Sequence, residues 1–407
     1  MEAMLNDAIS TINGYLWSYF IIFILIGAGL FFTMTTNFVQ IRMIKEMIRL
    51  VINGAGSSTE KNHVSSFQAF CVSTASRVGV GNIAGIAIAV VLGGPGAIFW
   101  MWVIALIGAA TGFIESTLAQ IYKEPVAKGG FYGGPAYYIR YGLNNKALSV
   151  LFAILISITY GWIYNSVQAN TLAASLQVFN LDVSYTGAVV AVLLGIIIFG
   201  GINRVAKASE IIVPIMAILY IATALFVVIM NITQFPHVIY TIFSSAFEPV
   251  AAGGGLLGAT VMNGIKRGLF SNEAGEGSVP NAAATAAVNH PVEQGLVQAF
   301  GVFLDTFIIC TASAFIVLIV GDYSTTGLTG IALVQHNLAH QLGSWAPSAV
   351  AIFIVMFSFS SLIGNYYYGE INISHLTNKR FYLHLFRIGV ILMTFVGSVA
   401  SLDLVWN

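Results

Sequence analysis

Long apolar runs, separated by short polar segments, dominate this chain. A transmembrane helix needs about 20 mostly apolar residues, and the sequence contains ten stretches of that kind. These predicted spans cover 15–36, 65–92, 97–122, 148–178, 184–201, 208–231, 253–290, 294–320, 345–370 and 382–404. No strand-like alternation recurs over segments of about ten residues. The pattern therefore predicts an all-α membrane protein.

Composition supports this interpretation. Charged residues make up 8% of the 407 residues, against roughly 25% in soluble domains. The 16 basic and 16 acidic side chains cancel, which argues against a nucleic-acid binder. Both cysteines, Cys71 and Cys310, lie inside apolar runs, so we expect buried thiols and no disulfide framework. The first run lacks the features of a signal peptide and is predicted to be a true span.

The basic residues indicate the orientation of the chain. Thirteen of the sixteen were assigned to four loops, which alternate along the chain with loops that contain none. These residues are Arg42, Lys45, Arg49, Lys61, Lys123, Lys128, Arg140, Lys146, Arg204, Lys207, Lys379, Arg380 and Arg387. The positive-inside rule places these loops in the cytoplasm. We expect a multi-pass protein of the cell membrane with an extracellular N-terminus.

The two halves of the sequence resemble each other at a shift of 190 residues. Residues 77–85 fall on residues 267–275 with Arg, Asn, Ala and Gly identical at four of nine positions, and Glu115 falls on Asp305. The predicted topology gives the two copies opposite orientations, which is a signature of secondary transporters. The other interpretation is a chance alignment of two glycine-rich helices.

The repeat predicts the organisation of the chain. Residues 1–62 form an extra N-terminal helix and a connector, 63–231 form a first repeat of five spans, and 232–407 form a second repeat. The second repeat contains four spans, because the partner of span 208–231 would lie beyond the last residue. We expect either that this helix is absent or that the sequence is truncated at its C-terminus.

Two of the spans contain helix breakers. Residues 79–82 interrupt the second span and residues 268–277 interrupt the seventh, after which Ser278 and Pro280 suit a new helix start. Broken backbone is tolerated in a membrane only where it meets water, protein or a ligand. Half-helix N-termini suit a carboxylate, and freed carbonyls suit Na⁺ or an ammonium group. Two breaks together favour a zwitterion plus a cation.

Longer motifs around these breaks resemble the alanine/glycine:cation symporter family, also called sodium:alanine symporters. The resemblance covers essentially the whole chain and is carried by residues 74–85, 133–138, 267–275, 277–281 and 364–370. It implies a LeuT-like fold of five plus five inverted spans with an extra N-terminal helix. It also implies Na⁺-coupled uptake of small neutral amino acids. Glu276 stands where the family more often has an apolar residue, which leaves the coupling ion less certain.

The resemblance also implies roles for residues at the breaks. We expect Val80, Gly81 and Asn82 to offer N–H groups to the substrate carboxylate, with Ser76 and Gly79 at the pocket wall. Phe270 would limit side-chain size, and Ser271 or Asn272 would bind the ammonium group or the ion. A packing kink or a core aromatic residue is the plainer interpretation of these positions.

Further candidates lie outside the two breaks. Asn165 and Gln168 share one face of the fourth span with Trp162, and would either bind the substrate or hydrogen-bond between helices. A Na⁺ site would combine the carbonyls of two residues with two hydroxyls, unless these serines bond their own helix. Its predicted ligands are Ala75, Val78, Ser360 and Ser361.

Three basic residues lie inside predicted spans, where an unpaired charge is costly. We expect Arg77, Lys266 and Arg267 to form gating or structural ion pairs. Their predicted partners are Glu115, Glu273, Glu276 and Asp305. Arg77 with Glu273 or Glu276 is one such pairing, although no spacing fixes it.

The sequence thus predicts a Na⁺-coupled symporter of alanine or glycine, acting as a monomer by alternating access without an organic cofactor. Proton coupling through Glu276 or Glu115 is the alternative. A single chain with an inverted repeat does not favour a channel. No nucleophile–base pair or metal cluster favours an enzyme, and His336 and His340 lie in a predicted external loop without a nearby cysteine.

Overall fold

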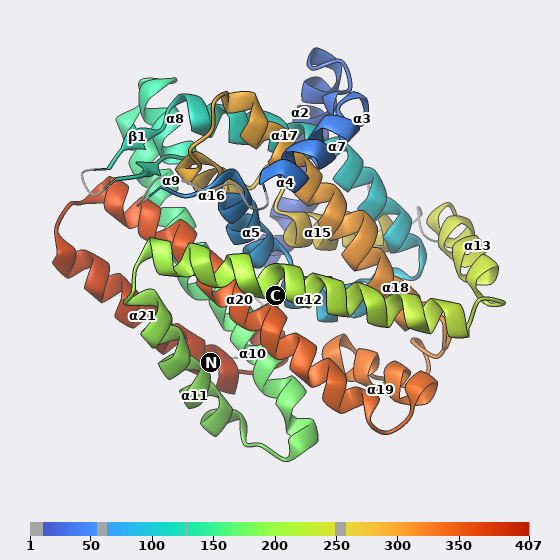
Figure 1. Ribbon diagram of the computed structural model, residues 1–407. Helices are drawn as coiled ribbons and strands as arrows, with labels where there is room; N and C mark the ends of the chain where they lie inside the picture. The colour runs from blue at the N-terminus through green and yellow to red at the C-terminus, as the bar shows by residue number, and fades with distance from the viewer. Residues whose placement is uncertain (1–10, 55–62, 127–128, 249–257, 407) are drawn as a thin grey trace.

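The protein is a bundle of helices (Figure 1). The computed structural model describes residues 11–54, 63–126, 129–248 and 258–406. Two short strands, β1 (Glu124–Pro125) and β2 (Phe131–Tyr132), pair antiparallel, and the other described elements are helical. The predicted all-α class is therefore confirmed.

Helices occupy all ten predicted spans. The first part of the chain forms η1 (Trp17–Ile21), α2 (Ile22–Thr35), α3 (Val39–Arg42), α4 (Ile44–Gly54), α5 (Ser66–Arg77), η2 (Val80–Asn82), α6 (Ala84–Gly93) and α7 (Gly96–Ile121). The next part forms α8 (Pro135–Tyr141), α9 (Lys146–Ile158), η3 (Thr159–Tyr164), α10 (Asn165–Ser175), η4 (Leu176–Phe179), α11 (Val183–Ile198), α12 (Ile202–Met230) and α13 (Phe235–Ala246).

The second part of the chain follows a similar plan. Its helices are α15 (Ala259–Asn272), α16 (Val279–Thr285), α17 (Pro291–Phe303), η5 (Leu304–Cys310), α18 (Thr311–Leu318), α19 (Gly330–Leu342), α20 (Ala346–Leu376), α21 (Arg380–Val399) and α22 (Leu402–Trp406). Both interrupted spans are broken within the predicted segments, between α5 and α6 and between α15 and α16. The inverted relation of the two halves stays a prediction.

Among the described residues, six continuous helical stretches are long and apolar enough to cross a membrane, and some of them join several of these elements. Three shorter helices are apolar as well. The protein is thus a multi-pass membrane protein. Residues 253–257 of the seventh predicted span, and Lys61 and Lys128 of the charged loops, lie outside the described residues. One assignment was wrong: Arg387 was counted with a loop, but it is buried within α21.

Close helix contacts surround the two breaks. α7 packs against α15, α16 and α17, while α20 packs against α5, α10 and α12, and Figure 1 shows α12 crossing α20. Small residues permit this packing. A Cβ atom on Gly264 of α15 would lie 2.3 Å from the carbonyl oxygen of Ala97 in α7.

A buried ion pair joins α20 to α21. Arg387 Nη2 lies 3.1 Å from Glu370 Oε1, and the side chains are 8% and 6% exposed. Tyr366 completes the group, because its hydroxyl accepts from Arg387 Nε at 2.7 Å and donates to Glu370. The guanidinium also lies over the ring of Phe199, at the end of α11. The pair therefore ties three helices together.

We expect Glu370→Gln to lower the free energy of unfolding by about 3–5 kcal/mol, because it leaves a buried arginine without its partner. The double variant E370Q/R387Q removes both charges and should recover most of that loss. Thermal unfolding of the purified protein in detergent measures both effects. The control Glu46→Gln, which removes an exposed pair with Arg49, should change little. Equal melting of the single and double variants would contradict the prediction.

Candidate functional site

The first helix break lies between α5 and α6. A capping box of Ser65 and Gln68 starts α5, which ends at Arg77. The chain then passes through one short 3₁₀ turn, where the side-chain oxygen of Asn82 accepts from the Gly79 N–H at 3.0 Å. Residues 77–82 are fully or almost fully buried. The break therefore exposes its backbone groups to protein neighbours, as a mid-membrane interruption requires.

The second break lies between α15 and α16. It begins at Glu273, a non-glycine residue in the left-handed conformation at φ +54°. The predicted helix start is confirmed, because Ser278 occupies the N-cap position of α16 and Pro280 lies in its first turn, but the Ser278 side chain makes no cap hydrogen bond. Its hydroxyl donates instead to Glu273 Oε2 at 2.6 Å.

The two breaks meet at one carboxylate. Ser76, in the last turn of α5, donates to Glu273 Oε1 at 2.6 Å and lies equally close to Asn365 Oδ1 of α20. The other oxygen of Glu273 accepts from Ser278. A buried acid in one break thus holds the opposite break in place. The predicted wall residue Ser76 lies at this junction.

Gln168 reaches the first break from α10. Its side-chain oxygen accepts from the Val80 N–H at 3.0 Å. A Cβ atom on Gly79 would lie 2.8 Å from the Gln168 amide and 2.4 Å from Ser361 Oγ. Glycine at position 79 therefore permits α10 and α20 to approach the broken backbone.

Two predicted neighbours of Gln168 make other contacts. Asn165 Nδ2 donates to the carbonyl of Gly161, one turn earlier, at 3.1 Å, and its role in substrate binding stays a prediction. Trp162 lies against α21, where a Cβ atom on Gly389 would be 2.9 Å from its ring nitrogen. Trp162 belongs to the π-helix η3, which ends at Tyr164 and changes its helical phase relative to α10, a feature that regular spacing could not reveal.

An aromatic wall covers the other side of the first break. A Cβ atom on Gly81 would lie 2.8 Å from the ring of Phe270, in the last turns of α15. That ring packs on Tyr164 at 5.0 Å between centroids and on Trp406 at 5.7 Å. Phe270 therefore packs against the first break.

The four predicted Na⁺ ligands are only partly gathered. Ser361 Oγ donates to the carbonyl of Ala75 at 2.8 Å, which joins α20 to the end of α5. The Val78 N–H donates to the Thr74 carbonyl at 2.8 Å, so the hydrogen bonds of α5 continue to the start of the break. Ser360 instead bonds the carbonyl of Phe357 in its own helix at 2.9 Å. Ala75 and Ser361 thus form the core of this candidate ion site.

A second group of polar side chains surrounds Asp305 in η5. Asn82 Nδ2 donates to Asp305 Oδ1 at 2.5 Å, and the hydroxyls of Ser271 and Thr306 donate to Oδ2 at 2.8 and 3.0 Å. Asn272 donates to Thr306 at 3.2 Å. The predicted residues Asn82, Ser271 and Asn272 therefore gather around an acid that the sequence suggested only as an ion-pair partner.

Arg77 does not form the predicted ion pair. It donates to the backbone carbonyl of Gln298 in α17 at 3.1 Å. Within the described part of the chain, no carboxylate oxygen lies within 4.0 Å of its side-chain nitrogens. Glu273 and Glu276, suggested as its partners, accept hydrogen bonds from hydroxyls instead. Arg77 thus bonds a carbonyl, and the two acids bond hydroxyls, where the sequence predicted an ion pair.

The other two embedded bases lie over aromatic rings. Lys266 Nζ is 5.4 Å from the centre of the Trp17 ring, and the Arg267 guanidinium is 5.1 Å from that of Trp406. Such contacts stabilise a cation by about 0.5–2 kcal/mol, depending on its exposure. The gating role predicted for these bases stays a prediction.

Two more acids contact the second break. Glu115 of α7 accepts from the Gly275 N–H at 3.2 Å. Glu276 accepts from the hydroxyl of Tyr160 at 2.6 Å. Glu115 thus bonds the backbone of the broken segment, and Glu276, which belongs to that segment, bonds a tyrosine of η3.

The far end of α16 is held from α7. Lys123, just after α7, donates to the carbonyl of Ala286 at 2.7 Å, and Gln120 donates to Ala283 and Ala286 at 2.5 and 3.0 Å. Burial lowers the pKa of Lys123 to about 8. The short helix α16 is thus fixed at both ends by side chains of other elements.

Sequence reasoning missed two residues of the site. Asn365 lies four residues after Ser361, on the same face of α20, so the helical spacing could have identified it. Asp305 was visible as the repeat partner of Glu115, but its position beside Asn82 depends on how η5 packs. Neither residue was proposed as a binding residue.

This arrangement matches a known architecture. The crystal structure of MhsT in complex with L-phenylalanine superposes with a TM-score of 0.61 at 14% identity, over 85% of this chain and 80% of that one. This likeness shows a LeuT-like membrane fold, in which the two broken helices lie side by side. The profile of the sodium:alanine symporter family matches residues 1–407. The chain belongs to that family.

Two relatives illustrate the range of the family. One, from Bacillus subtilis (strain 168), is named "Probable sodium/glutamine symporter GlnT"; it is 51% identical over 408 residues, covering 100% of this chain and 85% of the relative. The other is the sodium/alanine symporter AgcS of Methanococcus maripaludis. It is 40% identical over 406 residues, covering 98% of this chain and 89% of the relative.

Proposed function

We propose that this protein takes up small neutral amino acids, alanine or glycine, together with Na⁺ by alternating access. The observation that carries the proposal is the meeting of the two helix breaks at Glu273, where Ser76 and Ser278 bind its two oxygens. This places the freed backbone of both breaks around one buried centre. A zwitterion and a cation need donors and acceptors of this kind together.

The substrate carboxylate would bind at Val80. The N–H of Val80 now donates to the side-chain oxygen of Gln168, and a carboxylate could accept in its place. In the same short turn the Asn82 N–H donates to the Gly79 carbonyl at 3.2 Å, so the proposed donors to the carboxylate are the N–H groups of Val80 and Gly81. The amino group would lie toward Ser271 and Asn272.

Phe270 supports the choice of a small side chain. Its ring closely approaches Gly81, and Tyr164 and Trp406 hold it from behind. Methyl or hydrogen side chains need little room beside this wall. Since one relative is named for glutamine, the substrate panel must include that amino acid.

Na⁺ prefers hard oxygen ligands, and two sets lie at the first break. One contains the Ala75 carbonyl and the Ser361 hydroxyl. The other contains the hydroxyl of Ser271 and the carboxylate of Asp305. In the described residues no cluster of histidine, cysteine and acidic side chains suits a transition metal. The oxygen ligands therefore favour Na⁺ as the coupling ion.

The proposal also covers the setting of the protein. We place it in the cell membrane with the N-terminus outside, working as a monomer. The twelve bases of the predicted cytoplasmic loops, with Arg387 left out, support this orientation.

Purified protein in liposomes is expected to accumulate labelled alanine only under an inward Na⁺ gradient. Glycine and glutamine, tested alongside, define the substrate range. Uptake that persists after the Na⁺ gradient collapses, and is accompanied by alkalinisation outside the liposomes, would support proton coupling through Glu276 or Glu115. Absence of accumulation with any of the three substrates, in a preparation that binds alanine, would reject active symport.

A further inference from the structure

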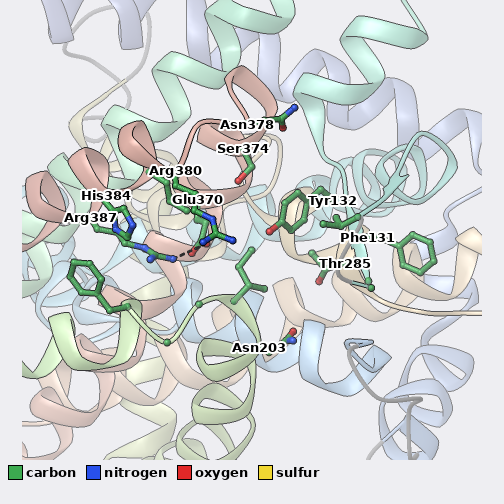
Figure 2. Close-up of a pocket in the computed structure, with 18 of the residues that line it drawn as sticks. Phe131, Tyr132, Asn203, Thr285, Glu370, Ser374, Asn378, Arg380, His384 and Arg387 are labelled. Carbon is green, nitrogen blue, oxygen red and sulfur yellow. Dashed lines mark hydrogen bonds and ion pairs between the residues drawn. The ribbon is translucent and has the colours of Figure 1, made fainter.

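A cavity of about 690 Å³ lies apart from the helix breaks, among the connections at one end of the bundle. Its walls come from the α11–α12 and α20–α21 connections, from β2, and from the segments that flank α5 and α16. In Figure 2, Arg387, His384 and Glu370 gather on one side, and Tyr132, Phe131 and Thr285 on the other. The predicted topology places this end in the cytoplasm.

The cavity lies at the far ends of the two half-helices that border the breaks. Val64, just before α5, and Thr285, the last residue of α16, both line it. The Ala287 N–H donates to the Val64 carbonyl at 2.9 Å, so these two ends are joined. α5 has 12 residues and spans about 18 Å at a rise of 1.5 Å per residue. A substrate that moves past these half-helices therefore enters the cavity.

A buried pair of opposite charges forms part of the wall. Arg387 and Glu370 lie 3.1 Å apart, and Tyr366 bonds both. A guanidinium has five N–H donors and a carboxylate about four acceptor sites, so each group keeps bonding capacity toward the cavity. Burying such a pair is costly and seldom serves stability alone.

The remaining charges of the lining favour a ligand with a carboxylate. Lys379, Arg380 and Arg387 contribute positive charge, and Glu370 is the one acidic side chain among the described residues that line the cavity. A free cation would be repelled by this lining. An amino acid can instead direct its carboxylate to Arg387 and its ammonium group to Glu370.

We propose that this cavity is a second binding site for the transported amino acid, occupied after the substrate leaves the helix breaks. The inference rests on the proposed function, because the ligand is the same zwitterion. Three basic side chains and one acidic side chain line the cavity among the described residues, and this excess of positive charge disfavours Na⁺. Binding in the cavity is therefore independent of Na⁺.

Equilibrium dialysis of labelled alanine against the purified full chain tests this site. With Na⁺ as the cation we expect two alanine molecules bound per chain. With choline in place of Na⁺ we expect one, which binds more weakly than the Na⁺-dependent molecule. The double variant E370Q/R387Q should lose the Na⁺-independent molecule and keep the Na⁺-dependent one. The control E46Q/R49Q, which removes an exposed charge pair outside the cavity lining, should keep both. Absence of the Na⁺-dependent molecule in the unmodified chain would reject the proposed function instead.

Competition on the unmodified chain provides a test that needs no variant. Unlabelled glycine should displace the Na⁺-independent alanine at least ten-fold more effectively than ethylamine or propionate, which each carry one of the two charges. Propionate that competes as well as glycine would identify a simple anion site and overturn the proposal. A single Na⁺-dependent alanine molecule per chain, or a second one that persists in a folded double variant, would overturn it as well.

Discussion

Gly79→Ala is expected to lower alanine uptake by about ten- to hundred-fold while leaving the protein in the membrane. The added methyl group would meet Ser361 Oγ at 2.4 Å and the Gln168 amide at 2.8 Å. Over-packing of this kind costs typically about 1–3 kcal/mol, and here it displaces groups on both sides of the break. Initial uptake rates in liposomes, normalised to the amount of protein, measure the effect.

A matched glycine provides the control for this experiment. Gly27 lies in α2, where an added Cβ atom would meet nothing within 4 Å. Gly27→Ala should therefore transport at the rate of the unmodified protein. Normal uptake by Gly79→Ala would show that the close approach of Gln168 and Ser361 to the break is not required for transport.

Asp305→Asn should raise the Na⁺ concentration required for half-maximal uptake by about ten- to hundred-fold. The substitution keeps the size of the side chain and removes the charge that Asn82, Ser271 and Thr306 now bind. Hydrogen bonds to a charged group contribute about 1.5–3 kcal/mol, and the oxygen set loses its charged member. The dependence of alanine uptake on external Na⁺ measures the shift.

Another acid on the same stretch of helix serves for comparison. Glu293 lies in the first turn of α17, away from the breaks, and Glu293→Gln should leave the Na⁺ dependence unchanged. An unaltered Na⁺ requirement in Asp305→Asn would separate Asp305 from ion coupling. The ion would then have to depend on the ligands around Ala75 and Ser361.

The sequence predicted the helices and both breaks because these features are local. Apolar length predicts a span, and clustered glycine with a capping residue predicts an interruption. Phe270 and Gln168 contact the first break, as their places on regular helices suggested, and their roles in substrate binding stay predictions. The family resemblance supplied the residues that local patterns alone would not single out.

The charged groups were predicted less well, since their partners are distant in the sequence. The cost of an unpaired charge in a membrane suggested ion pairs for Arg77, yet Arg77 donates to a carbonyl of α17, and its Nε and Nη2 atoms have no hydrogen-bond partner among the described residues. Arg387 was counted with the charged loop although position 387 already lies inside the predicted span 382–404, and the structure has it within α21. Its pairing with Glu370 depends on how α20 and α21 pack. Neither contact follows from spacing along the chain.

Each half of the chain supplies an acid that binds the break of the other half. Glu115 binds the break after α15, and Asp305 binds Asn82 in the break after α5. Asn82 and Asp305 are 223 residues apart, which takes on the order of 10–45 s to translate at roughly 5–20 residues per second. During that interval the nascent first half holds a polar break without its partner, at a cost that lipid cannot relieve. The first break therefore gains its acidic partner only after synthesis has reached the second half of the chain.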